Sequence, residues 1–331
     1  MNQNISKPQK SYEKQVRAGS LSPTSRLNAQ ESFFVDNSPP ENIDEIIAGT
    51  QKFIQNNLAN SRKIALITSG GTTVPLEKNT VRFIDNFSVG TRGAISAEYF
   101  IKNGYSVIFF HRKHSLQPFN RKYTKPQNGI LDFLCVEPNN NISVKPAYKI
   151  SFITDVECFN NAISDSRLFM PTFISLTDYL FGLRAISELL QKMNKNVIAY
   201  LASAVSDFYI PADKLAEHKI QSSDGQLTLV LIQVPKFLGN LANEWMPQAF
   251  LETDESILES KAIRSLDNYG HHAVIANMLH TRKEVVWIIS NKDRKSNEIR
   301  LTPKQLSENF EIEELIIQYL ISLHNRFLSE N

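Results

Sequence analysis

IALITSGGTTVPLEKNTVRFIDNFSVGTRG, residues 64–93, carries the clearest structural signals of the chain. It opens with an apolar run at 64–67, which is typical of a strand buried in a sheet. Residues 68–73 are two glycines among four hydroxyl-bearing residues, and such a turn can present backbone N–H groups to an anion. A second polar turn at 85–93 leads into a helix whose N-terminus suits a phosphate group. The stretch therefore predicts a nucleotide or phosphate site built from the first strand.

The segments that follow repeat the alternation of strand and helix. A helix predicted at 91–102 ends at Asn103-Gly104, a common helix-terminating pair, and the apolar run at 105–111 predicts a strand buried on both faces. A strand, a helix and a strand in this order form a parallel pair with a right-handed crossover. The pattern predicts an α/β fold with a doubly wound, mostly parallel, Rossmann-like sheet. The other predicted strands are 197–202, 272–276 and 285–290, and the other predicted helices are 41–58, 178–194, 236–244, 255–269 and 312–327.

Two regions break this alternation. Residues 1–40 are rich in Ser, Pro, Asn and Gln, so we expect a disordered N-terminal tail ahead of a single α/β domain at 41–327. Residues 112–175 are polar and irregular, and we expect an antiparallel excursion there that could serve dimerisation. Its candidate strands are 131–136, 148–153 and 172–176.

The composition excludes several classes of protein. The 331 residues carry 36 basic and 34 acidic side chains, so there is no global attraction to nucleic acid or to a membrane surface. No apolar run is long enough for a transmembrane helix, and the N-terminal segment lacks the apolar core of a signal peptide. Two cysteines predict reduced thiols rather than a disulfide framework. We expect a cytoplasmic enzyme.

Further candidate site residues follow the strand predicted at 197–202. Ser203, Ala204 and Asp207 lie at the carboxyl end of this strand, where doubly wound sheets bind ligands. Asp207 could bind a ribose hydroxyl, Mg²⁺ or a substrate amine, although a lone Asp in a turn is more often a cap. Lys219 could neutralise a triphosphate, although a single Lys is usually a solvated surface charge. Residues 235–238 begin a helix that could meet phosphate or base, or could simply start that helix.

Several absences limit the alternatives. Neither GxGxxG nor GxxxxGK[ST] occurs after the first strand, which disfavours an NAD(P)-dependent reductase and a P-loop enzyme. The histidines, His111 among them, show no metal-ligand spacing, and no metal site formed by protein side chains is predicted. Asn86 cannot act as a base, but its amide can hydrogen-bond a developing oxyanion.

Five motifs, in this order, carry a family resemblance: VRFIDNFSVGTRGA, ASAVSDFYIP, EHKIQSS, VPKFLG and LETDESI. Over about residues 41–325 the chain resembles eukaryotic phosphopantothenoylcysteine synthetases, the phosphopantothenate–cysteine ligases of coenzyme A biosynthesis. The resemblance implies that ATP, with Mg²⁺, activates the carboxylate of 4′-phosphopantothenate as an acyl-adenylate with release of pyrophosphate. The amine of cysteine then attacks, which gives 4′-phosphopantothenoylcysteine and AMP. It also implies a homodimer whose partner loops complete each site; bacterial relatives commonly use CTP, and the sequence does not decide between the two nucleotides.

The resemblance assigns roles to individual residues. Asn86 would hold the carbonyl of the acyl intermediate, and Lys219 would stabilise charge on the nucleotide phosphates. Ser88, Gly90 and Arg92 would bind the substrate. The nucleotide would be bound by Gly70, Gly71, Ser203, Ala204, Asp207, Pro235, Lys236, Phe237, Leu238, Lys261 and Arg264.

One strand departs from the family pattern. Gln248-Ala249-Phe250 runs directly into Leu251-Glu252-Thr253, whereas similar chains carry a fuller strand before this motif, with a Phe that packs on the nucleotide base. We expect a strand that is truncated near 249–251. A splice form or gene-model error, a variant that changes register and a non-catalytic relative would each explain it, and we favour the first. The alternative function is a catalytically impaired, dimerising scaffold in an assembly with other coenzyme A-synthesising enzymes.

Overall fold

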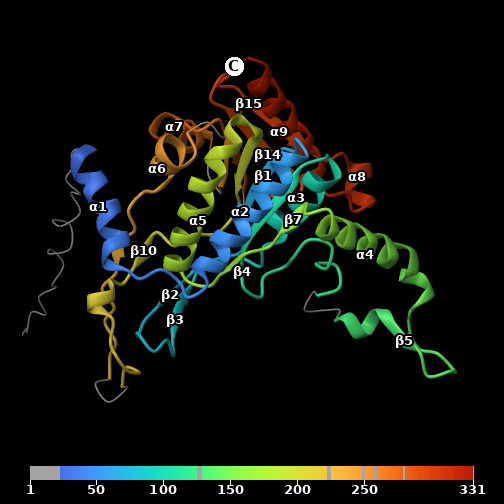
Figure 1. Ribbon diagram of the computed structural model, residues 1–331, viewed down its shortest axis with the longest axis horizontal. Helices are drawn as coiled ribbons and strands as arrows, with labels where there is room; N and C mark the ends of the chain where they lie inside the picture. Colours follow the sequence, from blue (N-terminus) through green and yellow to red (C-terminus); the bar gives the residue numbers. More distant parts are fainter. Residues whose placement is uncertain are drawn as a thin grey trace, which may run out of the picture.

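A computed structural model describes residues 23–124, 129–221, 225–247, 250–255, 259–278 and 280–330. Side chains are described in these ranges except at 23–28, 250–255 and 259–261. Within this part of the chain, the main sheet has nine strands in the order β15-β14-β13-β12-β9-β1-β4-β7, with β8 also beside β4. The neighbouring strands from β7 and β8 to β13 run parallel to one another. β14 is antiparallel to β13, and β15 is antiparallel to β14. The doubly wound, mostly parallel α/β fold is confirmed (Figure 1).

The strands of the main sheet have these bounds: β1 Ile64–Ser69, β4 Ser106–Arg112, β7 Leu168–Phe169, β8 Thr172–Phe173, β9 Val197–Leu201, β12 Phe250–Glu255, β13 Ala273–Ala276, β14 Val285–Ser290 and β15 Ser296–Arg300. Among the described residues, three two-stranded antiparallel pairs accompany it: β2 Thr73–Pro75 with β3 Phe83–Asp85, β5 Leu134–Val136 with β6 Ile142–Val144, and β10 Phe208–Tyr209 with β11 Ile232–Gln233. The helices are α1 Pro23–Asp36, α2 Ile43–Ala59, α3 Thr91–Lys102, α4 Lys149–Ser164, α5 Leu176–Leu190, α6 Leu238–Asn240, α7 Glu259–Tyr269, α8 Pro303–Ser307 and α9 Ile312–Ser329.

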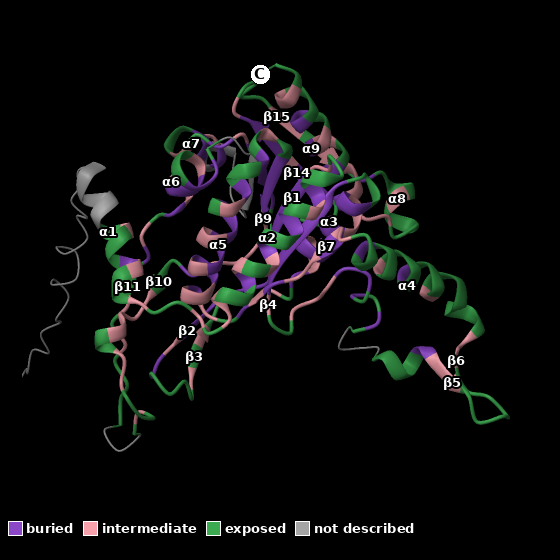
Figure 2. Cartoon of the chain, in the orientation of Figure 1, coloured by how far each residue is buried: buried purple, intermediate pink, exposed green. Residues whose placement is uncertain are grey.

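The two faces of the sheet are covered by different helices. Side chains alternate along each strand, so Ala65 and Ile67 of β1 face α3 and α9, whereas Ile64 and Leu66 face α2 and α5. Helix α7 packs on Val274 of β13. Because both faces are covered, the central strands are buried at nearly every position, as Figure 2 shows.

The strand expected to be truncated near 249–251 is complete in length. β12 is six residues long and pairs with β9 on one side and β13 on the other. The expected truncation is therefore wrong: the Leu-Glu-Thr motif itself supplies the strand, and residues 248–249 before it lie outside the described residues. A strand at this position is needed because the backbone groups of both neighbours would otherwise lose hydrogen-bonding partners.

Three further expectations need correction. Residues 23–36 of the expected disordered tail form α1, and the rest of that tail, residues 1–22, lies outside the described residues. The strand expected at 148–153 is the start of α4, and Ile150, 84% exposed, shows that the apolar–polar alternation there marks no buried face. The segment 172–176, expected within the antiparallel excursion, instead contributes β8, which runs parallel to β4 in the main sheet.

The irregular region does contain an antiparallel pair: β5 falls within the strand expected at 131–136, and its partner β6 was not predicted. β5 and β6 form a hairpin, and together with α4 this hairpin extends away from the sheet (Figure 1). We call residues 130–164 the arm. Within the described part of the chain, no helix has both the length and the apolar character needed to cross a membrane.

Candidate functional site

The loops that follow β1 and β9 are joined at the carboxyl edge of the sheet. The backbone N–H of Ala202 donates to the carbonyl of Thr68 at 3.2 Å, and that of Ala204 donates to Gly70 at 2.8 Å. The N–H of Thr72 donates in turn to Ala204 at 3.0 Å. The ladder of two neighbouring strands thus continues beyond their ends and fixes the loops 70–73 and 202–206. We call these two loops the rim.

Asn86 lies directly against the rim. Its N–H donates to the carbonyl of Thr72 at 3.0 Å, and its side chain is half-buried. A β-carbon added at Gly71 would come within 2.8 Å of the carbonyl carbon of Asn86 and within 3.1 Å of the nitrogen of Ser88. Only glycine permits this approach. The absence of a side chain at Gly71 therefore lets the backbone of Asn86 pack closely against the rim.

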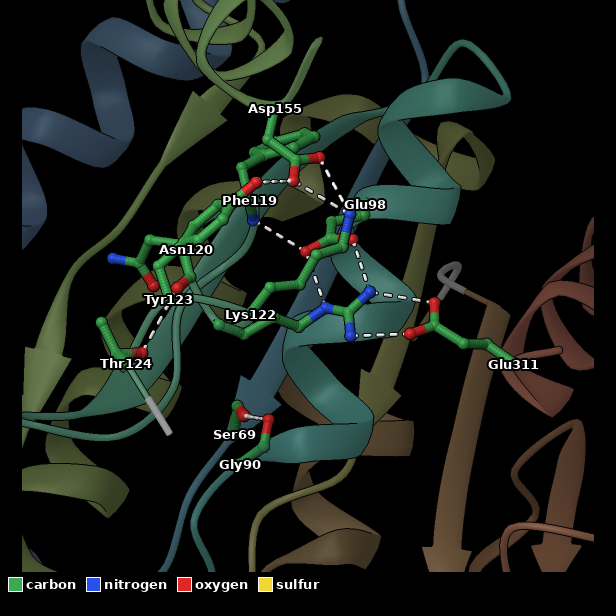
Figure 3. Close-up of polar contacts among 11 residues, drawn as sticks. Ser69, Gly90, Glu98, Phe119, Asn120, Lys122, Tyr123, Thr124, Asp155 and Glu311 are labelled. Atoms are coloured by element: carbon green, nitrogen blue, oxygen red, sulfur yellow. Dashed lines mark hydrogen bonds and ion pairs between the residues drawn. The ribbon is translucent and has the colours of Figure 1, made fainter. Parts of the chain in front are cut away.

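The N-terminus of α3 lies beside the same loop. Gly90 is its N-cap, with a φ of 82°, a left-handed conformation that favours glycine. The hydroxyl of Ser69 donates to the carbonyl of Gly90 at 3.2 Å (Figure 3), and the hydroxyl of Ser88 accepts from the N–H of Gly90 at 3.4 Å. The first N–H groups of a helix attract anions, so this terminus is suited to a phosphate.

A third segment reaches the rim through Asp207. The carbonyl of Asp207 accepts from the N–H of Val234 at 2.9 Å, and its carboxylate is 2.9 Å from the ammonium group of Lys236. Both charged side chains are more than half exposed. Phe237, in contrast, is buried in the core, so its ring is not presented to solvent. This segment offers a carboxylate, an ammonium group and backbone groups to a ligand.

Lys219 lies in a loop packed against the β2–β3 turn. The N–H of Lys78 donates to the carbonyl of Ala216 at 2.8 Å, and its ammonium group pairs with Glu217 at 3.0 Å. The guanidinium of Arg82 donates to the carbonyl of Ile220, the residue after Lys219, at 2.7 Å. The side chain of Lys219 is exposed. The β2–β3 hairpin, which ends one residue before Asn86, therefore also holds the Lys219 loop.

Glu77 is a buried carboxylate that the sequence analysis missed. Its side chain is fully buried and accepts from the N–H of Arg82 at 3.0 Å and from Arg82 Nε at 2.9 Å. Burial acts to raise the pKa of Glu77, but the hydrogen bonds from Arg82 and its positive charge outweigh burial and lower the pKa. Within the EKNTVR stretch the two residues look like ordinary surface charges. Only the tertiary packing reveals the pair.

Three basic candidates remain: Arg92, Arg264 and Lys261. Arg92, in the first turn of α3, donates to the carbonyl of Arg282 at 2.7 Å and so ties the helix to the loop before β14. Arg264 is exposed on α7, apart from the contacts that unite the rim. The side chain of Lys261 lies outside the described residues. The structure thus brings the glycines, Asn86 and Asp207 together, and the roles of Arg92, Arg264 and Lys261 stay predictions.

His111 is a second residue that the sequence analysis did not assign. It lies at the end of β4, opposite Ser69 in the register of the two strands, and is buried. Its Nδ1 is 3.0 Å from the carbonyl of Arg112 and 3.1 Å from the hydroxyl of Ser115. Burial lowers the pKa of His111 to about 4, although the bond to Arg112 acts in the opposite direction. The imidazole beside the rim is therefore neutral at physiological pH.

An ionic cluster anchors the segment after β4 (Figure 3). The guanidinium of Arg121 is held by Glu98 of α3 at 2.8 Å and by Glu311 at 2.7 Å. Nearby, Asp155 of α4 accepts from Lys122 at 2.9 Å and from the hydroxyl of Tyr123 at 2.8 Å. These contacts fix the base of the arm to the helix whose N-terminus faces the rim.

The fold and this arrangement define an α/β protein with a polar, glycine-lined, anion-attracting site at the carboxyl edge of its sheet. No family model matches the chain. It is 40% identical to the phosphopantothenate–cysteine ligase of Saccharomyces cerevisiae, over 94% of this chain and 90% of that protein. It is 39% identical to a phosphopantothenate–cysteine ligase of Arabidopsis thaliana, over 91% of this chain and 95% of that protein.

A solved structure agrees with these relatives. The complex of a Cab2 mutant with phosphopantothenate-cysteine superimposes with a TM-score of 0.83 at 40% identity, over 91% of this chain and 99% of that chain. The chain therefore belongs to the phosphopantothenate–cysteine ligase family.

Proposed function

We propose that this protein joins 4′-phosphopantothenate to cysteine in coenzyme A biosynthesis. ATP activates the pantothenate carboxylate as an acyl-adenylate, and pyrophosphate leaves. The cysteine nitrogen then attacks the acyl carbon, AMP leaves, and the amine proton passes to solvent. Membership of the ligase family supports the overall reaction. The nucleotide, the intermediate and the residue roles are the finer parts of the proposal.

The observation that carries the proposal is the position of Asn86. Its backbone is fixed to the rim through Thr72 and Gly71, and its half-buried amide remains partly open. An amide N–H at this place can donate to the carbonyl oxygen of the acyl-adenylate and to the negative charge that grows there during attack. Because the amide is neutral, it does not remove the proton of the cysteine amine.

The anions of both substrates have separate binding groups. The α3 N-terminus, with Ser88 and Gly90, suits the phosphate of phosphopantothenate. Asp207 and Lys236 are exposed for the ribose and phosphates of ATP. Lys219 would neutralise the phosphates as pyrophosphate leaves. This role is supported by the exposed side chain of Lys219 and by the contact of Arg82 with Ile220, which holds its loop.

The donors present fit a Mg²⁺ ion that is held chiefly by the nucleotide. Among the described residues, no group of three or more His, Cys, Asp or Glu side chains could hold a metal ion. Asp207 is the carboxylate that projects at the rim, and one carboxylate together with phosphate oxygens is a common Mg²⁺ environment. When bound, the ion would neutralise phosphate charge.

Two variants separate the two halves of the reaction. Pyrophosphate release from ATP and phosphopantothenate, measured without cysteine, reports activation, and product formation with cysteine reports transfer. We expect Lys219→Gln to lower both rates by about 100-fold, and Asn86→Asp to lower product formation most strongly. Lys214→Gln, which alters another exposed Lys of the same region, is the control and keeps both rates.

Retention of full turnover by either variant would refute the assigned roles. The same assay with CTP in place of ATP decides the nucleotide. The scaffold alternative predicts a folded protein that binds no ATP at millimolar concentration. The shortened strand that motivated this alternative gives it no support, because β12 has six residues.

We also propose a homodimer formed through the arm. Its apolar side chains are unusually exposed: 78% for Leu131, 68% for Val136, 71% for Ile142 and 84% for Ile150. A cluster of exposed apolar residues on a projecting element is typical of an interface. The ionic cluster at its base ties the arm to α3, so a partner bound to the arm would act on the helix beside the site.

Sedimentation equilibrium tests the dimer. We expect Leu131→Ser and Ile150→Ser together to shift the protein from dimer to monomer. Val35→Ser is the matched control, because Val35 is 83% exposed on α1, outside the arm, and this variant stays dimeric. A monomeric wild type, or a double variant that remains a dimer, would exclude this interface.

A further inference from the structure

The N-terminal helix α1 contributes two adjacent aromatic side chains to the core. Phe33 is 1% exposed, and its ring centroid is 5.5 Å from that of Phe237 and 5.2 Å from that of Tyr209. Both contacts are edge-to-face, an arrangement that adds to the stabilisation gained from burial alone. The two partners belong to different segments of the site, since Tyr209 follows Asp207 and Phe237 follows Lys236.

Phe34 also packs on Phe237 and reaches Trp245, further along the same segment. Its ring centroid is 5.3 Å from that of Phe237 and 6.0 Å from that of Trp245. The guanidinium of Arg184 lies 4.8 Å from the ring of Phe34, a cation–π contact that fixes α1 to α5. The two phenylalanines thus connect α1, α5 and the residues on both sides of α6.

A hydrogen bond between α1 and Lys236 adds to this packing. The side-chain amide of Gln30 donates to the carbonyl of Lys236 at 2.6 Å. The carbonyl that α1 holds therefore belongs to the residue whose ammonium group pairs with Asp207.

The segment held by α1 has little regular structure of its own. α6 contains three residues and continues into a π-helical turn at Leu241–Trp245, so few repeating backbone bonds fix residues 235–238. The rim is different, because loops 70–73 and 202–206 are fixed by the extended strand ladder. Loss of the α1 contacts would therefore loosen residues 235–238 and leave the rim in place.

We propose that α1 positions the nucleotide-binding segment 235–238, with Phe33, Phe34 and Gln30 as its positioning residues. This rests on the proposed assignment of 235–238 to ATP. With α1 docked, Lys236 and Asp207 are held ready for the nucleotide. Without it, ATP must order this segment as it binds, and its apparent affinity falls.

Steady-state kinetics on the full chain test this role. We expect Phe34→Ala and Gln30→Ala to raise KM for ATP, by about five- to tenfold for Phe34→Ala, while KM for phosphopantothenate changes by less than about twofold. Phe34→Tyr, which keeps the ring, restores the wild-type value. Val35→Ala, on the exposed side of the same helix, is the control and leaves both KM values unchanged.

A purely structural role of α1 would give a different result. Destabilisation alone lowers the melting temperature and the active fraction, and hence kcat, with no change in KM for ATP; that outcome overturns the inference. Equal increases in both KM values also overturn it, because the rim would then depend on α1. Calorimetric titration of each variant with ATP alone gives the affinity independently of turnover. If the wild type is an active ligase and Phe34→Ala binds ATP with wild-type affinity, the role of α1 is refuted and the proposed function stands. If the wild type shows no ATP-dependent ligation, the proposed function itself is refuted.

Discussion

Replacement of Gly71 by alanine tests the geometry of the site most severely. The added β-carbon would lie 2.8 Å from the carbonyl carbon of Asn86, closer than real β-carbons approach any atom. The carbonyl oxygen lies closer still, so the backbone of Asn86 must retreat by on the order of 1 Å before the methyl group fits. Because that backbone also carries the hydrogen bond to Thr72, the amide cannot keep its place.

A displacement of this size predicts a large loss of activity and a modest loss of stability. A catalytic group misplaced by about 1 Å can cost on the order of 100-fold in rate, so we expect kcat to fall by about this factor. Overpacking at a tight site costs about 1–3 kcal/mol, which leaves the protein folded. Product formation and denaturant unfolding of the same preparation measure the two effects.

The control is Gly129→Ala. An added β-carbon there meets no atom within 4 Å, and the φ of Gly129 is −79°, which any residue adopts. We expect this variant to keep its activity. If Gly71→Ala retained kcat within about twofold of the wild type, the close packing of Asn86 on the glycine turn would not be what positions the amide, and the reasoning would be refuted.

Two further predictions concern buried ionisable groups. Glu77→Gln removes the charge that holds Arg82 and thus the carbonyl of Ile220, so we expect pyrophosphate release to fall by about tenfold; a wild-type rate would contradict this. The pKa values of His111 and His324 are each lowered by burial to about 4. Between pH 6.5 and 4 these two histidines bind protons in the unfolded chain but stay neutral in the folded protein. The free energy of unfolding therefore falls as pH falls, by about 2 kcal/mol per histidine between pH 7 and 5. Urea unfolding of wild type and His324→Gln at both pH values measures this, and an equal pH dependence in the two proteins would exclude a contribution from His324.

The central α/β core could be predicted from the sequence because its signals are local. The apolar run at 105–111 corresponds to β4, Ser106–Arg112, and the helix predicted at 91–102 is α3, Thr91–Lys102. Asn103-Gly104 ends this helix as predicted, with Gly104 at a φ of 88°. Strands buried on both faces consist almost wholly of apolar residues, so their positions are visible without knowledge of their neighbours.

The errors arose where tertiary contacts decide the structure. The Phe33-Phe34 pair lies in a polar segment, and only its contacts with Phe237 and Trp245 give α1 a buried face. The alternating residues at 148–153 resemble a strand, yet they begin a helix on the projecting arm. β12 was expected to be short because the chain lacks the fuller strand that similar chains carry before Leu251-Glu252-Thr253, but the gap between β9 and β13 requires a strand there.

The proximity of several candidate site residues could also be predicted from the sequence. The glycine turn, Asn86 and the segment at Asp207 meet at one edge of the sheet, as expected of residues at the carboxyl ends of neighbouring parallel strands. The Glu77–Arg82 pair could not be predicted, because its significance lies in the burial of one partner and in the contact with Ile220. Arg92 was chosen as a substrate ligand from its position at a helix N-terminus; its guanidinium donates to the carbonyl of Arg282, and its role toward the substrate stays a prediction.

A crystal structure with a non-hydrolysable ATP analogue and 4′-phosphopantothenate bound together tests the central claim most directly. The account predicts the pantothenate carboxylate within hydrogen-bond distance of the Asn86 amide, its phosphate at the N-terminus of α3, and the triphosphate between the rim and Lys236. Both ligands bound away from the carboxyl edge of the sheet, with Asn86 facing solvent, would contradict it.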